Sequence, residues 1–223
     1  MHGFTATPRE MRSLGERLCA ENFTVFSVRL PGHGTTPEDL AQRSVEEWLA
    51  AVERGYQILQ QQQLLISGVG ISTGALLLLK LSRLHSFNGL ALLSPFLQLS
   101  HPLADFAGII SIVRPFQQRP IAAAEQPFYY HRRPLKGVAQ INRLRRGLKQ
   151  QLPEITLPVL VLAAEGDATI APGSALQLFN LLGSADKEFH CYGPEVPHVL
   201  TTAENPQQQD VFTRVISFLN RLP

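Results

Sequence analysis

The chain has 223 residues, of which 44% are hydrophobic and 17% are charged, a balance that fits one globular domain with one sizeable core. The formal net charge of +2 is too small to indicate a nucleic-acid or membrane-surface partner. The two cysteines, Cys19 and Cys191, show neither metal-site nor disulfide-framework spacing. Since no signal-peptide pattern or bilayer-spanning run is visible, we expect reduced thiols, a cytoplasmic location and no stable membrane insertion.

Apolar runs of β-type composition alternate with helical patterns along the chain. The predicted strands cover residues 24–30, 64–67, 89–93, 159–163 and 188–192. Helices are indicated by capping-box sequences at 7–10 and 44–47, by an apolar run at 75–84, and by start signals near 172 and 205. This alternation predicts the α/β class with a mostly parallel, doubly wound sheet. The crossovers of such a sheet bring together the loops at the carboxyl ends of its strands.

Residues 98–151 interrupt the alternation, because they contain five prolines and no clear strand. We therefore expect an α/β core of residues 1–97 and 152–223 and a helical cap of residues 98–151. Seven basic side chains crowd the cap: Arg132, Arg133, Lys136, Arg143, Arg145, Arg146 and Lys149. A solvated helix face is the simplest interpretation of this cluster. Attraction of anionic substrates or of an anionic lipid surface is the alternative.

The segment Gly70-Ile71-Ser72-Thr73-Gly74 matches the G-x-S-x-G pattern of a nucleophile elbow. By itself the pattern also fits a glycine-rich turn whose serine caps a helix. Its context favours the elbow, because a predicted strand precedes it, a strongly apolar helix follows it, and glycines allow the tight turn that exposes a hydroxyl. Ser72 is therefore the candidate nucleophile. The N–H of Thr73, at the helix N-terminus, is a candidate oxyanion donor.

A nucleophilic serine needs a base and an orienting carboxylate, and in this kind of fold the acid and then the histidine follow it along the chain. Asp167 comes directly after a predicted strand, with Glu165 as the alternative acid. His198 follows the last predicted strand by a short loop, whereas His33 fits a structural loop. The candidate triad is therefore completed by Asp167 and His198.

A second landmark is the dipeptide His2-Gly3 before the first predicted helix. A turn of this kind can present the next backbone N–H, that of Phe4, to a developing oxyanion. Together with the Thr73 N–H it would aim two donors at one oxygen. An ordinary N-terminal turn is the alternative.

A family resemblance rests on five segments in this order: His2-Gly3-Phe4-Thr5, Arg29-Leu30-Pro31-Gly32-His33-Gly34, Gly70-Ile71-Ser72-Thr73-Gly74, Gly166-Asp167 and Pro197-His198-Val199-Leu200-Thr201. They resemble small bacterial carboxylesterases and monoacylglycerol lipases of the α/β-hydrolase superfamily, over nearly the whole chain. The resemblance implies a triad of Ser72, Asp167 and His198, oxyanion donors Phe4 and Thr73, and cleavage of a small-molecule acyl ester. It implies no cofactor and no metal.

The chain departs from the family pattern at three places. Thr73 and Ala75 stand where relatives often carry methionine and glycine, and Pro197 stiffens the loop before the candidate base. Relatives also carry an apolar strand before the His-Gly turn, between the strands that correspond to residues 24–30 and 64–67. We expect this chain to lack that strand, so that it is a trimmed version or the two flanking strands have closed together.

These observations predict a serine hydrolase that cleaves carboxylic esters through an acyl-enzyme. A thioesterase, acyltransferase or amidase with the same triad is one alternative. A truncated, non-catalytic binding protein of the same fold is another. Nucleic-acid binding is disfavoured, because the basic cluster has no interleaved aromatic residues.

Overall fold

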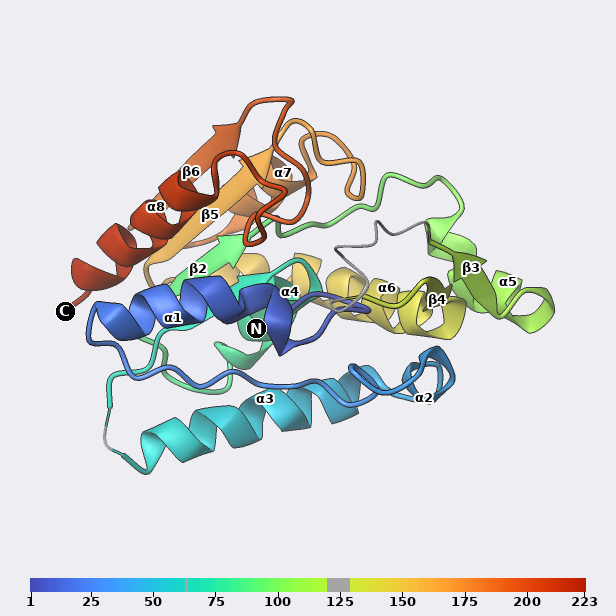
Figure 1. Cartoon of the computed structure of the whole chain (residues 1–223), viewed down its shortest axis with the longest axis horizontal. Helices are drawn as coiled ribbons and strands as arrows, with labels where there is room; N and C mark the ends of the chain where they lie inside the picture. Colours follow the sequence, from blue (N-terminus) through green and yellow to red (C-terminus); the bar gives the residue numbers. More distant parts are fainter. Residues whose placement is uncertain (63, 120–128) are drawn as a thin grey trace.

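A parallel four-stranded sheet lies in the middle of the molecule, in the order β1-β2-β5-β6 (Figure 1). The structure is a computed structural model that describes residues 1–62, 64–119 and 129–223. The sheet strands are β1 (Gly68–Ile71), β2 (Leu90–Leu93), β5 (Val159–Ala164) and β6 (Lys187–Tyr192). The parallel register runs Gly68 opposite Leu90, and Leu90 opposite Val159, so the carboxyl ends of the strands meet at one edge.

Helices cover both faces of this sheet, as a doubly wound fold requires. One face packs on α3 (Val45–Gln60), α4 (Thr73–Leu81), α6 (Leu135–Lys149) and α7 (Ser174–Leu181). The other face packs on α1 (Arg12–Ala20) and α8 (Gln208–Asn220). Residues along β2 alternate between the two cores, with Leu90 and Leu92 on the first face and Leu93 on the second. The predicted α/β class and doubly wound sheet are therefore confirmed.

Shorter helices connect these elements. They are η1 (Pro8–Met11), α2 (Pro37–Leu40), η2 (Ala104–Phe106), α5 (Ala107–Val113) and η4 (Leu152–Glu154). No helix among the described residues is both long and apolar enough to cross a bilayer.

The predicted strands at 89–93, 159–163 and 188–192 are confirmed, but two others are wrong. Residues 64–67 form no strand, because β1 begins only at Gly68. Glycine has a low strand propensity, so glycines 68 and 70 make this strand difficult to predict from composition. The packing nevertheless requires glycine at position 68, because a Cβ there would lie 2.7 Å from the Leu90 side chain. Residues 24–30 also form no strand, because no neighbouring strand pairs with them.

The two predicted capping boxes differ in outcome. At Ser44, the side chain accepts a hydrogen bond from the Glu47 N–H, and the Glu47 carboxylate accepts one from the Ser44 N–H at 2.8 Å, which confirms the box. At Thr7 the prediction is wrong, since the Thr7 side chain caps nothing and a 3-10 turn follows. The carboxyl of Glu10 is instead buried and bonded to the Gly3 N–H, which has no other acceptor among the described residues.

The N-terminus lies inside the fold beside β1. The Met1 amino group donates to the Val69 carbonyl at 2.7 Å, and the Ile71 N–H donates to the Met1 carbonyl at 3.0 Å. These two bonds are those of a parallel strand pair with Met1 opposite Gly70. The chain therefore carries one residue of strand pairing on the open edge of β1, directly before the His2-Gly3 turn.

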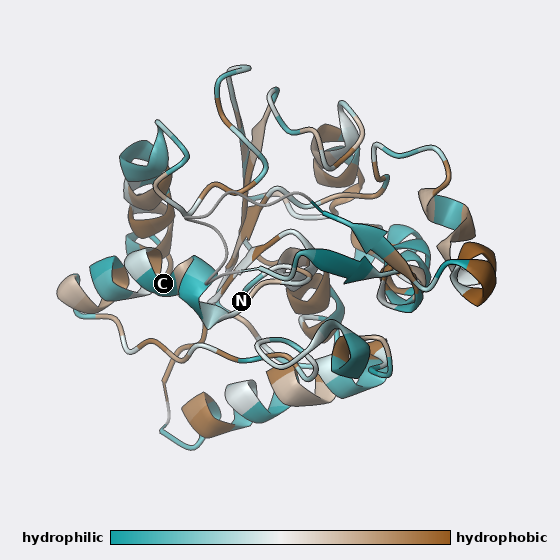
Figure 2. Cartoon of the chain, turned by 45° about the vertical axis from the view of Figure 1, so that its right-hand side comes forward, coloured by the Kyte–Doolittle hydropathy of each residue, from teal (hydrophilic) through white to brown (hydrophobic). Residues whose placement is uncertain are grey.

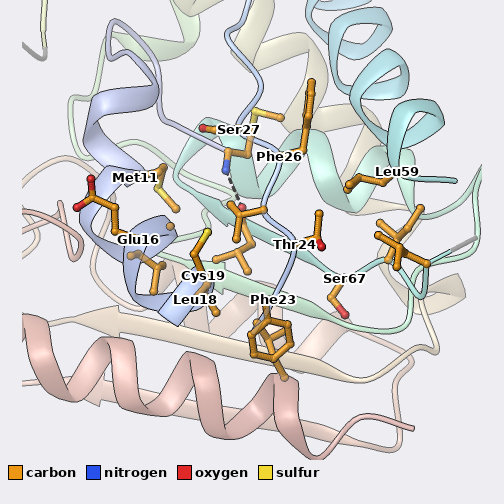
Figure 3. A pocket seen from close by; sticks show the side chains of 18 of the residues that line it. Met11, Glu16, Leu18, Cys19, Phe23, Thr24, Phe26, Ser27, Leu59 and Ser67 are labelled. Carbon is orange, nitrogen blue, oxygen red and sulfur yellow. Dashed lines mark hydrogen bonds between the residues drawn. The ribbon is translucent and has the colours of Figure 1, made fainter. Parts of the chain in front are cut away.

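A wide apolar groove of about 780 Å³ continues from Met1 along this open edge of β1. Figure 3 shows the extended segment of Phe23, Thr24, Phe26 and Ser27 along one side of it, Ser67 on the other side, and Leu18 of α1 beside it. Residues 24–29 make no backbone hydrogen bond to any other described residue. The two segments expected to flank a central strand have therefore not closed together.

Among its described residues, the segment expected to be a cap contains the helices η2, α5 and α6, but it also contains two short strands. The strands β3 (Phe116–Gln118) and β4 (Arg132–Pro134) pair antiparallel with Gln117 opposite Arg133, so the expectation of no strand is wrong there. They stand with α5 at one end of the molecule (Figure 1). At the same end, Figure 2 shows the outermost turns of α5 as strongly apolar, and Ile112 and Val113 are exposed.

Candidate active site

Ser72 occupies a sharp turn between the end of β1 and the start of α4. Its backbone angles, φ 54° and ψ −121°, lie in a region that residues other than glycine rarely adopt. The Ser72 N–H is held by the Leu93 carbonyl at 2.8 Å. A Cβ on Gly74 would lie 2.6 Å from the carbonyl oxygens of both Met1 and His2, so only glycine allows the N-terminal turn to approach the helix.

Asp167 and His198 form a directly bonded pair. The distance between His198 Nδ1 and Asp167 Oδ2 is 2.5 Å, and the Asp167 side chain is only 2% exposed. The other carboxylate oxygen, Oδ1, accepts the N–H groups of Thr169 and Ile170 at 2.8 and 3.1 Å. The contact with Asp167 Oδ2 favours the tautomer that carries its proton on Nδ1, which leaves the lone pair of Nε2 free to accept a proton.

The three predicted triad residues come from three different strand ends and meet at one edge of the sheet. Ser72 follows β1, Asp167 follows β5 and His198 follows β6. Ser72 and His198 line the same small cavity, of about 50 Å³, although no hydrogen bond joins their side chains among the described interactions. The base loop is anchored by Ser94, whose hydroxyl donates to the His198 carbonyl at 2.8 Å. The alternative acid, Glu165, is exposed, and the described His198 ring bonds to Asp167 instead.

Phe4 and Thr73 line the same cavity as the serine and the histidine. Thr73 is the first residue of α4, where a backbone N–H has no partner within the helix. The Phe4 N–H donates to no other described residue. The Phe4 ring is fixed against His33 and Trp48, at centroid distances of 5.8 and 5.9 Å. Both predicted oxyanion donors are thus unoccupied N–H groups beside Ser72.

Two buried histidines support the turn that carries Phe4. His2 Nε2 accepts the Leu30 N–H at 3.2 Å, and its ring packs against His33 at 5.0 Å. Burial lowers the pKa of His2 well below its usual value, and it lowers the pKa of His33 to about 4. Both rings are therefore neutral at pH 7, which agrees with the structural role expected for His33.

Sequence reasoning missed three acidic or basic side chains that line this cavity: Glu10, Arg119 and Arg133. The Glu10 carboxyl accepts the Gly3 N–H at 2.7 Å and the Tyr129 hydroxyl proton at 2.6 Å, and burial raises its pKa. The spacing that suggested a capping box concealed this contact. Arg133 was counted only as one member of a basic cluster, because its inward orientation depends on the β3–β4 pairing.

The described residues contain no group of three or more His, Cys, Asp or Glu side chains that could hold a metal ion. Both cysteines carry free, exposed thiols.

Comparison with known proteins places this geometry in a family. The sequence model of the alpha/beta hydrolase family matches residues 1–217. The chain belongs to this family. A thermostable monoacylglycerol lipase of Bacillus sp. (strain H-257) is 31% identical over 210 residues, which cover 84% of this chain and 77% of that protein. A carboxylesterase of Bacillus subtilis (strain 168) is 25% identical over 227 residues, covering 100% of this chain and 91% of that protein.

Solved structures share the α/β-hydrolase fold. One, from work on the metagenome-derived lipolytic enzymes LipS and LipT, aligns with a TM-score of 0.89 at 22% identity, covering 99% of this chain and 91% of that one. The monoacylglycerol lipase of Paleococcus ferrophilus aligns with a TM-score of 0.81 at 20% identity, covering 98% and 91%. The resemblance to carboxylesterases and monoacylglycerol lipases is thus confirmed, and the curated relatives are carboxylic ester hydrolases.

Proposed function

We propose that this α/β-hydrolase cleaves carboxylic esters through an acyl-enzyme on Ser72. The observation that supports this most directly is the buried Asp167–His198 pair, whose imidazole lines one cavity with a serine on a strained turn. Strain of this kind persists where the surrounding fold enforces it, and it is typical of catalytic turns.

In the proposed mechanism, Ser72 Oγ attacks the ester carbonyl while His198 Nε2 takes its proton. Asp167 holds the ring in the tautomer that leaves Nε2 basic and stabilises the imidazolium that forms. The N–H groups of Phe4 and Thr73 donate to the tetrahedral oxyanion. His198 then protonates the leaving alcohol, and a water molecule activated by the same ring releases the acid.

Apolar side chains complete the cavity and provide contacts for the carbon chain of an acyl ester. They are Phe96, Leu99, Val138, Ile141 and Val199. Val138 and Ile141 belong to α6, within the segment of residues 98–151. We assign that segment as the cap, because it supplies Val138, Ile141 and two arginines to the cavity that Ser72 lines.

The test compares Ser72→Ala with Ser82→Ala. Ser82 is the C-cap residue directly after α4, and its hydroxyl donates to the Leu79 carbonyl. Ser82 does not line the cavity, so Ser82→Ala is a control for the loss of a serine hydroxyl next to this helix. We expect the unmodified chain and Ser82→Ala to react with a fluorophosphonate probe and to hydrolyse p-nitrophenyl esters. Ser72→Ala should do neither. Ester turnover that persists in Ser72→Ala refutes the proposal.

Transfer of the acyl group from a thioester uses the same residues and is the second candidate. The bonded Asp167–His198 pair and the unoccupied Thr73 and Phe4 N–H groups serve either reaction equally. A panel of matched oxygen esters and thioesters decides between them. A chain that binds such esters and never labels with the probe would be a non-catalytic binding protein.

A further inference from the structure

Two arginines of the cap reach into the cavity that holds Ser72. Arg133 lies in β4 opposite Gln117 of β3, and Arg119 follows β3, with its N–H bonded to the His131 carbonyl at 2.8 Å. The two-stranded pairing brings both side chains to the same side of the cap. Arg119 and Arg133 therefore line the cavity together with Ser72 and His198.

Arg133 is a half-buried side chain whose guanidinium has no counterion among the described residues. Its Nε is buried and bonded to no described group. Other arginines of the same basic cluster are paired, Arg132 with Glu38 and Arg143 with Glu46. Burial, together with the charge of Arg119, lowers the pKa of Arg133 to about 10, so it still carries its charge at pH 7. A buried charge of this kind is costly unless something pairs with it.

Arg119 is held in a fixed position next to the oxyanion turn. Its Nη1 donates to Thr5 Oγ1 at 3.2 Å, and its guanidinium lies over the Tyr129 ring at 4.4 Å from the centroid. The only acid that lines this cavity within the described residues is Glu10, whose own pKa is raised by burial. The described lining of the cavity thus contains two guanidinium groups and one carboxyl group, and the raised pKa of that carboxyl disfavours its ionised form.

We infer that Arg133 and Arg119 form an anion subsite that binds a carboxylate on the ester substrate, a few atoms from the carbonyl that Ser72 attacks. This inference rests on the proposed ester hydrolysis and narrows its substrate class. A guanidinium offers parallel N–H donors that match the two oxygens of a carboxylate. The free carboxylate of a dicarboxylic acid half-ester is a compact group of this kind, and the two arginines line the same cavity as Ser72.

The experiment compares two esters of equal size in the full chain. Mono-p-nitrophenyl succinate carries the carboxylate, and p-nitrophenyl 4-methylpentanoate carries a branched alkyl end of similar shape in its place. Arg133→Met removes the charge and keeps most of the side-chain volume. Arg133→Lys keeps the charge but removes the parallel N–H donors of the guanidinium group. Arg143→Met is the matched control, because Arg143 is an exposed arginine of the same cluster that pairs with Glu46.

We expect Arg133→Met to lower kcat/KM for the succinate ester by about 10-fold to 100-fold, the worth of a charge-assisted hydrogen bond, mainly through KM. The neutral ester should change by no more than about 3-fold. Arg133→Lys should recover part of the loss, and Arg143→Met should affect neither ester. Equal losses in Arg133→Met and Arg143→Met would show general electrostatic attraction and overturn the subsite.

A binding measurement separates this inference from the proposed reaction. Calorimetric titration of Ser72→Ala with succinate requires no catalysis. Binding that disappears in the double variant Ser72→Ala/Arg133→Met supports the subsite even if neither ester is hydrolysed. Absence of binding, together with equal kcat/KM for the two esters, overturns the subsite and leaves ester hydrolysis standing.

Discussion

In the 223-residue chain with Met1 as its first residue, the buried amino group predicts a specific dependence of stability on pH. The group donates to the Val69 carbonyl inside the fold, and burial lowers its pKa from 8.0 to about 5. Between these two values the unfolded chain binds a proton that the folded chain does not. The free energy of unfolding must therefore rise with pH across the window from 5 to 8, and the folded chain must lose stability as the pH falls.

The size of this effect follows from the difference between the two pKa values. A difference of one pKa unit corresponds to about 1.4 kcal/mol in the free energy of unfolding. The unfolded chain is half protonated at pH 8 and the folded chain is half protonated at pH 5, so the amino group lowers the free energy of unfolding by about 3 kcal/mol between these two values. An acetyl group on the Met1 nitrogen abolishes the titration and keeps the N–H that donates to Val69. The groove next to Met1 has room for the acetyl group.

The assay is urea unfolding of the free and the acetylated chain at pH 5, 6, 7 and 8. His33, whose pKa is also lowered by burial, is present in both chains and cancels in the difference, while His2 differs only by the loss of its weak repulsion from the amino group. We expect the acetylated chain to gain about 3 kcal/mol over the free chain as the pH falls from 8 to 5. A difference that stays constant across this range would mean that the amino group is not buried uncharged, and the N-terminal pairing on β1 would be wrong.

Three substitutions test the rest of the site. Glu10→Ala leaves the Gly3 N–H buried without an acceptor, so it should lower the free energy of unfolding in urea by about 1–3 kcal/mol. Glu10→Gln keeps an acceptor oxygen and should lower it by less. Equal losses of stability in the two variants would contradict this role. Asp167→Asn should lower kcat by about 10³–10⁴-fold with little change in KM, because the amide favours the wrong tautomer of the ring, and unchanged kcat would remove Asp167 from the proposed triad. Gly74→Ala pushes on the Met1 and His2 carbonyls and should lower both kcat and the melting temperature with the far-ultraviolet spectrum retained, so a fully active variant would refute the close approach.

The sequence by itself determined the fold class and the positions of the candidate triad. Strands that are buried on both faces read as continuous apolar runs, so 89–93 and 159–163 were predicted almost to the residue. The turn at Ser72 and the loops at Asp167 and His198 follow strands, and parallel strands bring such loops to one edge. Local composition and topology are sufficient for these features.

Only the tertiary structure decided which backbone groups find partners and which side chains face the cavity. Residues 24–30 have strand composition but form no strand, because a strand requires hydrogen bonds to a neighbour and the described chain supplies none there. Glu10 has the spacing of a capping residue, yet its carboxyl pairs across the fold with Gly3 and Tyr129. Arg133 is one of the seven basic residues named in the predicted cap, and only the β3–β4 pairing brings its side chain to the cavity that Ser72 lines. These outcomes depend on contacts between residues far apart in the chain, which spacing along the sequence does not encode.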